Sequence, residues 1–249
     1  MTFYAQLKNL FTALVKEHSL FDEPVSISAR ILKNEEAIGN PTRQDYPLLK
    51  GKEFLMEACF KDCRGQAFTD APCEKLSTLA EILALPLDIT ENRALFIASL
   101  NAVMRYLKPE IATVHCRDDE PEDCAGEVIR RLQQQSVTKV GLVGLQPAII
   151  EQLAATFGAE HVACVDRDEN QRGSSKFGVP IQWGDEKETA ELFQQCDLVL
   201  ATGSTVVNGS LPGLLSLAEE AAVPLFFFGT SIAGTAELMN LKRYCFEAA

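Results

Sequence analysis

Hydrophobic and polar residues follow two different patterns along the chain. From residue 138 onward, short apolar runs alternate with amphipathic stretches about ten residues long. The apolar runs have the length of buried strands, and they predict strands at residues 138–144, 161–166, 179–183, 196–203 and 223–229. The stretches beside them predict helices at residues 122–135, 147–158, 186–195 and 211–221. Strands alternating with helices indicate a parallel sheet covered on both faces, the Rossmann-like doubly wound arrangement of α/β proteins.

The first 108 residues follow a different order. An amphipathic helix is predicted at the N-terminus, with apolar side chains at helical spacing from Phe3 to Leu14. The segments that follow predict two strands, a polar turn and two helices, at residues 25–32, 53–60, 65–72, 74–85 and 91–107. Strands followed by helices are typical of a small α+β domain. Because Pro109 stops the last helix, we expect an α+β domain over residues 1–108 and the Rossmann-like domain over 109–249.

Composition narrows the class of protein. The chain is 47% hydrophobic and 23% charged, which is typical of a globular protein. The N-terminus lacks the features of a signal peptide, and the longest apolar run, at 223–229, is too short to span a bilayer, so we expect a cytoplasmic protein that does not enter membranes. The net charge is −12, and −11 of it falls after residue 108, which argues against binding nucleic acid. A homodimer is the expected oligomer, since this is the commonest assembly.

Ligands of open parallel sheets bind beyond the carboxyl ends of the strands. Gly144 is placed to turn the chain sharply into a helix, but Gln146 stands where a dinucleotide fingerprint has its second glycine, so we expect no ordinary NAD site. Asp166 ends the next predicted strand, where nucleotide-binding relatives of this fold carry a ribose-binding acid. Its alternative role is to cap the following loop.

The loop "ATGSTVVNGS", residues 201–210, is rich in hydroxyl groups and glycine. It follows one predicted strand and precedes a helix, so its hydroxyls and backbone amides could hold an oxyanion or a polar ligand. A capped turn is the alternative, with Asn208 and Gly209 in the turn and Ser210 as the N-cap. "GTSIAG", residues 229–234, presents the same chemistry after the last strand, with Thr230 or Ser231 as a possible cap.

The stretch "HCRDDEPEDC", residues 115–124, is the candidate metal site. Thiolate and imidazole ligands suit zinc, ferrous iron or nickel, and the candidate ligands are His115, Cys116 and Cys124, with Cys245, Cys59 or Cys63 as a fourth. We expect Cys124 near a helix N-terminus, where the dipole favours the thiolate. The alternative is a solvated acidic turn that only favours the start of a helix. Cys164 and Cys196 lie in or beside apolar strands and are expected in the core.

Four of these segments carry a family resemblance: "VGLVGLQPAIIEQL", "VDRDENQRG", "DLVLATGSTVVNGS" and "FFFGTSIAG". They resemble the heavy-metal chelation family, whose members join a Rossmann-like domain to one resembling the N-terminal part of enolase. The first-domain segments "GNPTRQDYPLLKGKE", "DCRGQAFTD" and "ASLNAV" are similar to the same family, so the resemblance covers nearly the whole chain.

The resemblance implies a ligand cleft between the two domains. The cleft residues that it implies are Gly144, Asp166, Thr202, Gly203, Ser204, Thr205, Asn208 and Gly229, faced by Asn101 and the turn at 65–70. Their neighbours Gln146, Gly209, Thr230 and Asp70 complete the candidate set, and Asp70 could act as a general base or as a cap.

Three functions remain open at this point. The first is chelation of a transition metal, or metabolism of a small molecule that binds one. The second is a metal-free transferase or lyase acting on a nucleotide-like or phosphorylated small molecule, with Asp166 on a ribose. The third is a sensor that binds a small molecule without chemistry. The sequence contains no Walker loop and no recognisable hydrolase motif, and it leaves open whether a reaction is catalysed.

Overall fold

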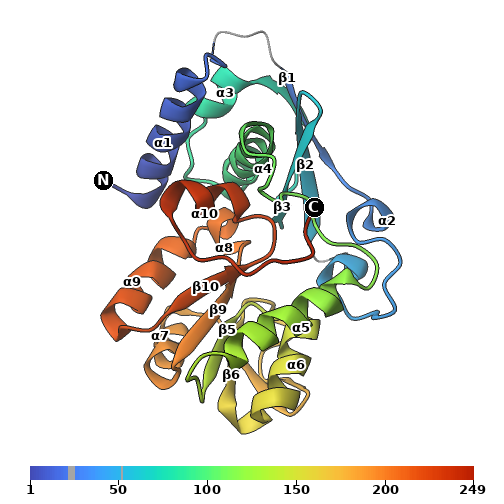
Figure 1. Ribbon diagram of the computed structural model, residues 1–249, viewed down its shortest axis with the longest axis vertical. Coiled ribbons are helices and arrows are strands. Elements are labelled where there is room, and N and C mark those ends of the chain that lie inside the picture. Colours follow the sequence, from blue (N-terminus) through green and yellow to red (C-terminus); the bar gives the residue numbers. More distant parts are fainter. Residues whose placement is uncertain (22–25, 52) are drawn as a thin grey trace.

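Two sheets organise the protein in a computed structural model that describes residues 1–21, 26–51 and 53–249 (Figure 1). Val25, the first residue of a predicted strand, and Lys52, in one of the family-like segments, lie outside the described residues. The first sheet has four antiparallel strands in the order β3-β2-β1-β4. Its strands are β1 (Ser26–Ile31), β2 (Phe54–Phe60), β3 (Cys63–Thr69) and β4 (Lys75–Thr78).

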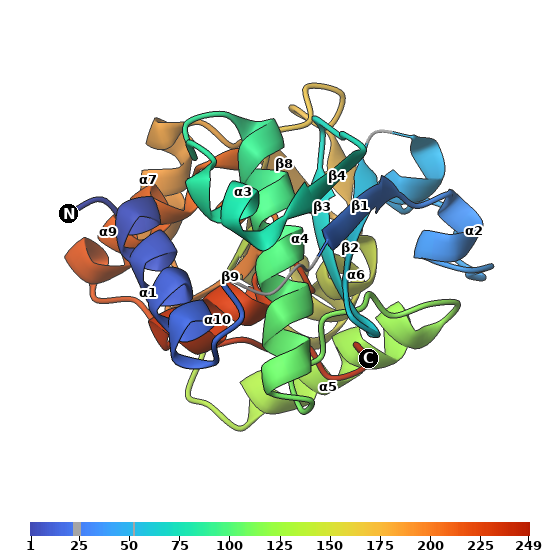
Figure 2. The ribbon, with the colours of Figure 1, turned by 90° about the horizontal axis from the view of Figure 1, so that it is seen from above.

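Helices cover the first sheet on one side, and a short segment flanks it. The helices are α1 (Phe3–Glu17), α3 (Leu79–Ala84) and α4 (Thr90–Leu107), and the flanking segment contains α2 (Asn34–Ala37) and the 3₁₀ turn η1 (Pro47–Lys50). Figure 2 shows α4 lying between α1 and the sheet, and twelve of its residues are buried there, from Arg93 to Met104. Gly65 of β3 approaches α4 so closely that a Cβ atom would stand 2.0 Å from the Ala102 amide nitrogen. Glycine is therefore required at this contact.

The second sheet has six strands in the order β10-β9-β5-β6-β8-β7. Five are parallel to one another and β7, at the edge, is antiparallel. The strands are β5 (Val140–Val143), β6 (Val162–Asp166), β7 (Ser175–Lys176), β8 (Val179–Trp183), β9 (Leu198–Thr202) and β10 (Leu225–Phe228). The helices are α5 (Glu120–Gln133), α6 (Pro147–Phe157), α7 (Glu186–Gln195), α8 (Thr205–Asn208), α9 (Leu211–Ala221) and α10 (Ala233–Met239), and η2 (Ala159–His161) precedes β6.

Alternate residues of each central strand pack into different cores. Leu198 and Leu200 of β9 join a core formed with α5 and α6, whereas Val199 and Ala201 join one formed with α7 and α9. Helices therefore cover both faces of a mostly parallel sheet, which confirms the predicted Rossmann-like fold. The core on the α7 side continues without interruption into the apolar residues of α1 and α4, so the two sheets belong to one packed body.

Two local predictions were wrong. Residues 63–69 form strand β3 rather than a polar turn, because they pair along their whole length with β2. Residues 75–78 form strand β4 against β1, so the helix predicted over 74–85 begins only at Leu79, where Thr78 caps it. The core positions predicted for Cys164 and Cys196 are confirmed. Among the helices of the described residues, none is both long enough and apolar enough to cross a bilayer.

Candidate functional site

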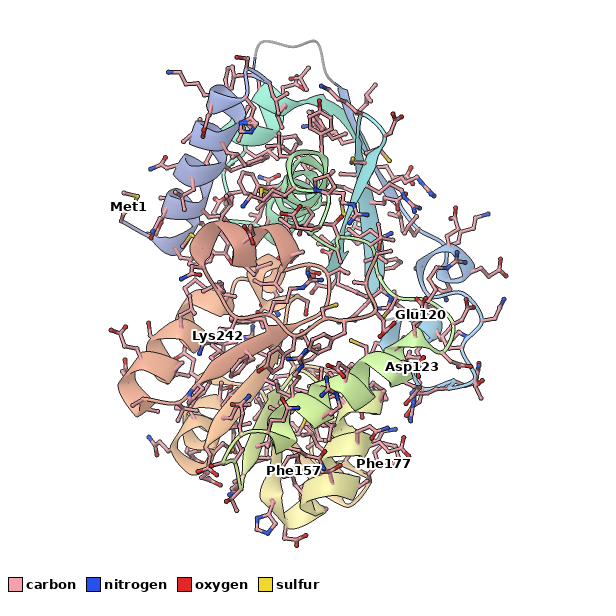
Figure 3. The ribbon with its side chains drawn as sticks, in the orientation of Figure 1. Met1, Glu120, Asp123, Phe157, Phe177 and Lys242 are labelled. Atoms are coloured by element: carbon pink, nitrogen blue, oxygen red, sulfur yellow. The ribbon has the colours of Figure 1, made fainter. Side chains whose placement is uncertain are left out.

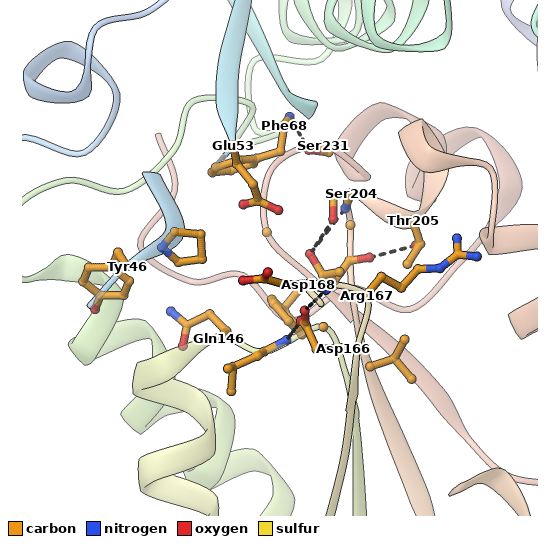
Figure 4. A pocket seen from close by; sticks show the side chains of 18 of the residues that line it. Tyr46, Glu53, Phe68, Gln146, Asp166, Arg167, Asp168, Ser204, Thr205 and Ser231 are labelled. Atoms are coloured by element: carbon orange, nitrogen blue, oxygen red, sulfur yellow. Dashed lines mark hydrogen bonds between the residues drawn. The ribbon is translucent and has the colours of Figure 1, made fainter. Parts of the chain in front are cut away.

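A cavity of about 540 Å³ lies beyond the carboxyl ends of the parallel strands (Figure 4). The ends of β5, β6, β9 and β10 line its floor, and residues of the first half of the chain, from Asp45 to Asp70, line the opposite wall. This is the edge of the sheet at which open α/β folds bind their ligands. Its volume falls in the range of small-molecule sites.

Gly144 brings two strand ends together on the cavity floor. It has a φ of +89°, and a Cβ atom at this position would lie 2.5 Å from Cγ2 of Thr202. Beside it, the Gly203 amide donates to the Phe228 carbonyl oxygen at 2.7 Å, which holds the ends of β9 and β10 together. The floor is therefore a close-packed layer of backbone.

Asp166 lines the cavity, and its carboxylate also fastens two loops. One oxygen accepts the Leu145 amide at 2.6 Å and the other accepts the Asp168 amide at 2.7 Å. Gln146 caps α6, because its Oε1 accepts the Ile149 amide at 2.6 Å. The side chain at the position of the second fingerprint glycine therefore occupies one of the free amides that an anion would need.

The hydroxyl-rich loop after β9 holds its own shape through side-chain hydrogen bonds. Thr205 donates its hydroxyl to the Thr202 carbonyl oxygen at 2.8 Å, and the hydroxyls of Thr202 and Ser204 lie 3.1 Å apart. Asn208 accepts both the amide and the hydroxyl of Ser210. Most of the predicted cleft residues line the cavity: Gly144, Gln146, Asp166, Thr202, Gly203, Ser204, Thr205, Asn208, Gly229, Thr230 and Asp70.

Two predicted cleft residues lie elsewhere. Asn101 is fully buried in α4, donates to the carbonyl oxygens of Gln66, Thr230 and Ser231, and accepts the Gly234 amide. It positions the turn at the cavity without facing the ligand space. Gly209 ends α8 with a φ of +92° and packs against Arg93.

Five carboxyl groups line the cavity: Asp45, which pairs with Arg43 and Lys176, and Glu53, Asp70, Asp166 and Asp168, which come from both halves of the chain. Figure 4 shows the Glu53 carboxyl group pointing down toward Asp168 from the opposite wall. Burial first, and then the negative charges of Asp166, Asp70 and Asp168, raise the pKa of Glu53 to about 7. Sequence analysis missed Glu53, because nothing in the pattern of residues 53–60 indicates that this carboxyl faces the second sheet.

The residues of the predicted metal clamp line another wall of the same cavity. They are His115, Cys116, Cys124 and Cys245. Burial lowers the pKa of His115 to about 4 and raises that of Cys116. Across the described ranges 1–21, 26–51 and 53–249, no three His, Cys, Asp or Glu side chains converge as metal ligands. The four-ligand clamp stays a prediction.

Cys124 does not have the thiolate character that its position predicted. Its pKa is raised, first by the neighbouring Cys245 and then by burial, whereas the pKa of Cys245 is lowered to about 6 by its interaction with Cys124. At Cys124, the neighbouring Cys245 and burial therefore outweigh the helix dipole.

The acidic run between His115 and Cys124 fastens the start of α5 to the first half of the chain. Asp118 accepts the Asn40 amide at 2.8 Å, and Asp119 accepts both the amide and the hydroxyl of Thr42. Figure 3 shows Glu120 and Asp123 at this end of α5. The run is therefore a structural joint, and the solvated-turn alternative describes only part of it.

Comparisons with known proteins agree with this fold. A protein of unknown function from the DUF364 family of Pyrococcus horikoshii superposes with a TM-score of 0.55 at 15% identity, over 94% of this chain and 81% of that one. Another protein of that family, from Desulfitobacterium hafniense, gives 0.52 at 14% identity, over 94% and 84%. No curated protein matches the chain. Residues 127–238, which include the floor of the cavity and most of the predicted cleft, match the family model DUF364, described as "Putative heavy-metal chelation".

Proposed function

We propose that the protein binds a transition metal ion as a complex with a small organic chelator, in the cavity at the strand ends. The observation that carries this proposal is the meeting of Glu53, Asp70, Asp166 and Asp168 around one cavity, with the pKa of Glu53 raised to about 7. Carboxyl groups that repel one another in this way bind a cation favourably, because the cation removes their mutual repulsion. The description of the matching family points in the same direction.

The organic chelator supplies the metal ligands that the carboxyl groups of the cavity do not. The carboxyl groups line the cavity without closing on one point, so they can complete the coordination of an ion that already carries part of its ligand shell. Zinc, ferrous iron and nickel accept such mixed oxygen and nitrogen ligands.

The hydroxyl-bearing loops suit the organic part of the ligand. Thr230 is 1% exposed and lines the cavity, and its Oγ1 has no hydrogen-bond partner within the described part of the chain. A buried hydroxyl without a partner costs free energy that a ligand oxygen or nitrogen would restore. Thr202 and Ser204 add further hydroxyls on the same floor.

A metal-free phosphorylated ligand is the weaker alternative. Its phosphate would lie among the carboxyl groups of a cavity that Lys50, Arg167 and Lys176 also line, and the Gln146 side chain already occupies one amide at the N-terminus of α6. The position of Asp166 at the end of β6 favours a ribose-containing ligand. Nucleotides are therefore included in the tests described below.

The test is isothermal titration calorimetry with Zn²⁺ and Ni²⁺, each presented alone and as its citrate or histidine complex. We expect at least one complex to bind more tightly than the bare ion, and Glu53→Gln to weaken that binding about tenfold or more, because it removes a carboxylate from the wall. Glu220→Gln, on the exposed surface of α9, is the matched control and should bind like the parent.

A thermal-shift series with nucleotides and sugar phosphates runs in parallel. Stabilisation by one of these, together with equal metal-complex affinities in the parent and Glu53→Gln, would refute the proposal in favour of the phosphorylated ligand. The absence of binding by every metal probe would also refute it.

A further inference from the structure

Three cationic side chains of the described residues line the cavity, and they differ in their partners. Lys176 pairs with the Asp45 carboxylate at 3.3 Å. The Lys50 and Arg167 side chains have no ion pair and no hydrogen bond within residues 1–21, 26–51 and 53–249. A cation that lines a ligand cavity without a partner is a candidate contact for an anionic group of the ligand.

The chain is fixed on both sides of Arg167. The Gly184 amide donates to the Asp166 carbonyl oxygen at 2.8 Å, and the Asp168 amide donates to the Asp166 carboxylate at 2.7 Å. Gly184 also leaves room for the arginine stem, because a Cβ atom there would stand 3.0 Å from Cγ of Arg167. The Arg167 side chain therefore starts from a defined position at the edge of the sheet, directly after β6.

Arg167 lies between two aspartates in the sequence and pairs with neither. The Asp166 carboxylate accepts two backbone amides, and Asp168 accepts the amide and Nδ2 of Asn170. Successive side chains at the end of a strand point to opposite sides, which separates the guanidinium from both acids. Figure 4 shows Arg167 extending past Thr205 and away from Asp168.

Hydroxyl groups lie on the same side of the cavity as Arg167. Figure 4 shows Ser204 and Thr205 there, and both residues line the cavity. The hydroxyls of Ser204 and Thr202 lie 3.1 Å apart, so one donates to the other and the second keeps a hydrogen for a ligand. A guanidinium fork beside a hydroxyl donor suits the two oxygens of a carboxylate.

We infer that Arg167 binds a carboxylate group of the organic chelator that the metal ion leaves free, so that the ligand is a metal complex of a polycarboxylate. The inference rests on the proposed function and names the class of chelator. The metal end of the complex meets Glu53, Asp70, Asp166 and Asp168, and the anionic end meets Arg167. Such a ligand binds in one orientation, because the reversed one would place like charges together.

The single charge of a carboxylate also fits this position better than a phosphate group does. A carboxylate carries one negative charge, which one guanidinium balances. A phosphate monoester carries about −1.5 to −2 at neutral pH, so part of its charge would remain unbalanced in a cavity that carboxyl groups line.

The experiment compares three probes by isothermal titration calorimetry. They are the Ni²⁺–citrate complex, the Ni²⁺–triethylenetetramine complex, which carries no carboxylate, and metal-free citrate. Arg167→Gln should weaken the binding of both citrate probes about tenfold or more and leave the amine complex unchanged, because it removes a charge-assisted contact to the carboxylate. Arg167→Lys should restore part of the citrate affinity, since lysine keeps the charge and lacks the fork.

The matched control is Arg172→Gln. Arg172 lies on the same loop, its guanidinium stands 5.4 Å from the centre of the Trp183 ring, and it does not line the cavity. This variant should bind all three probes like the parent. Arg167 is exposed, so its variants should fold like the parent, and an unchanged unfolding temperature checks this.

The outcomes separate this inference from the proposed function. Equal Ni²⁺–citrate affinities in the parent and Arg167→Gln, or equal losses for the citrate and amine complexes, would overturn the carboxylate contact and leave the metal complex standing. If no metal complex bound, the proposed function would fail. The carboxylate contact would then stand only if metal-free citrate bound in an Arg167-dependent way. Arg167-dependent binding of glucose 6-phosphate, without binding of either citrate probe, would overturn the assignment to a carboxylate.

Discussion

His115 shows how burial fixes a charge state at the cavity wall. Its imidazole packs edge-on against the Phe68 ring with centroids 5.1 Å apart, and burial lowers its pKa to about 4. At neutral pH the imidazole is therefore uncharged. Glu53, across the same cavity, is shifted in the opposite direction, since its pKa is raised to about 7. Both shifts favour the neutral form of the side chain.

The His115 shift makes stability depend on pH with a definite sign. The unfolded chain takes up a proton at this histidine below about pH 6.5, and the folded protein does so only near pH 4. The stability that this group contributes is therefore complete above pH 6.5 and is lost as the pH falls toward 4. The loss amounts to about 3 kcal/mol, because one pKa unit corresponds to about 1.4 kcal/mol.

His115→Phe should remove this loss, because phenylalanine does not titrate. Urea unfolding at intervals from pH 7.5 to 4.5 should show the parent losing stability relative to the variant as the pH falls. Glu53 titrates in both proteins, so its opposite slope cancels in the comparison. His161→Gln, at an exposed histidine, is the control and should leave the slope of the parent unchanged. Parallel profiles for the parent and His115→Phe would contradict the prediction.

Among the elements, α4 positions the cavity, and its first residue, Thr90, lines it. Its Asn101 ties β3 to the turn after β10 through three donated hydrogen bonds and one accepted one. Ser99, two residues earlier on the same helix, is equally buried, but its hydroxyl has no hydrogen-bond partner among the described residues. α4 therefore carries two buried polar side chains in similar surroundings. Asn101 has hydrogen-bond partners, and the Ser99 hydroxyl has none among the described residues.

Asn101→Ala should therefore cost about 2–4 kcal/mol of unfolding free energy, because it leaves buried carbonyl and amide groups without partners. Ser99→Ala should be neutral or stabilising, since it removes a buried polar group that has no partner. Chemical denaturation with both variants checks the pair of expectations. Equal losses in the two variants would show that helix packing, and not hydrogen bonding, is what Asn101 provides.

The elements also show which parts of the fold local sequence determines. The alternating strands and helices after residue 120 could be predicted because the strands are uniformly apolar and the helices amphipathic. β3 could not be predicted, since Gln66 and Thr69 point polar groups into the protein. Gln66 finds its partners in Glu57 and the His115 amide, which are distant in sequence. A strand whose inward side chains are polar lacks the hydrophobic alternation that identifies strands.

The candidate site likewise contains residues whose meeting the sequence predicts and residues whose meeting it does not. Gly144, Asp166 and the loop at 202–205 follow strands of one parallel sheet, so their meeting at one edge could be predicted from the sequence. Glu53 joins them only through the packing of the two halves of the chain, which no local pattern encodes. The pairing of Cys124 with Cys245 likewise depends on the path of the C-terminal segment.

At the scale of the whole molecule, Arg43 connects the wall of the cavity to the helices of the second sheet. Its guanidinium binds Glu122 of α5 and Glu151 of α6, and it lies 3.3 Å from Asp45, which lines the cavity. The Arg43 side chain is only 17% exposed, so solvent screens these ion pairs weakly. Removing the guanidinium would leave three carboxylates without their shared cation.

Arg43→Gln should lower the unfolding free energy by about 1–3 kcal/mol and should loosen the segment that carries it. Amide hydrogen exchange should become faster for residues 38–48, while the strands of the second sheet keep their protection, because the ion pairs fasten the segment and not the sheet. The control is Arg130→Gln, since Arg130 pairs with Glu127 on the exposed face of α5, where solvent screens the ion pair. If exchange at residues 38–48 were unchanged, or rose equally in both variants, the wall of the cavity would be held by its apolar contacts, such as those of Leu48 and Ile38, and not by this cation.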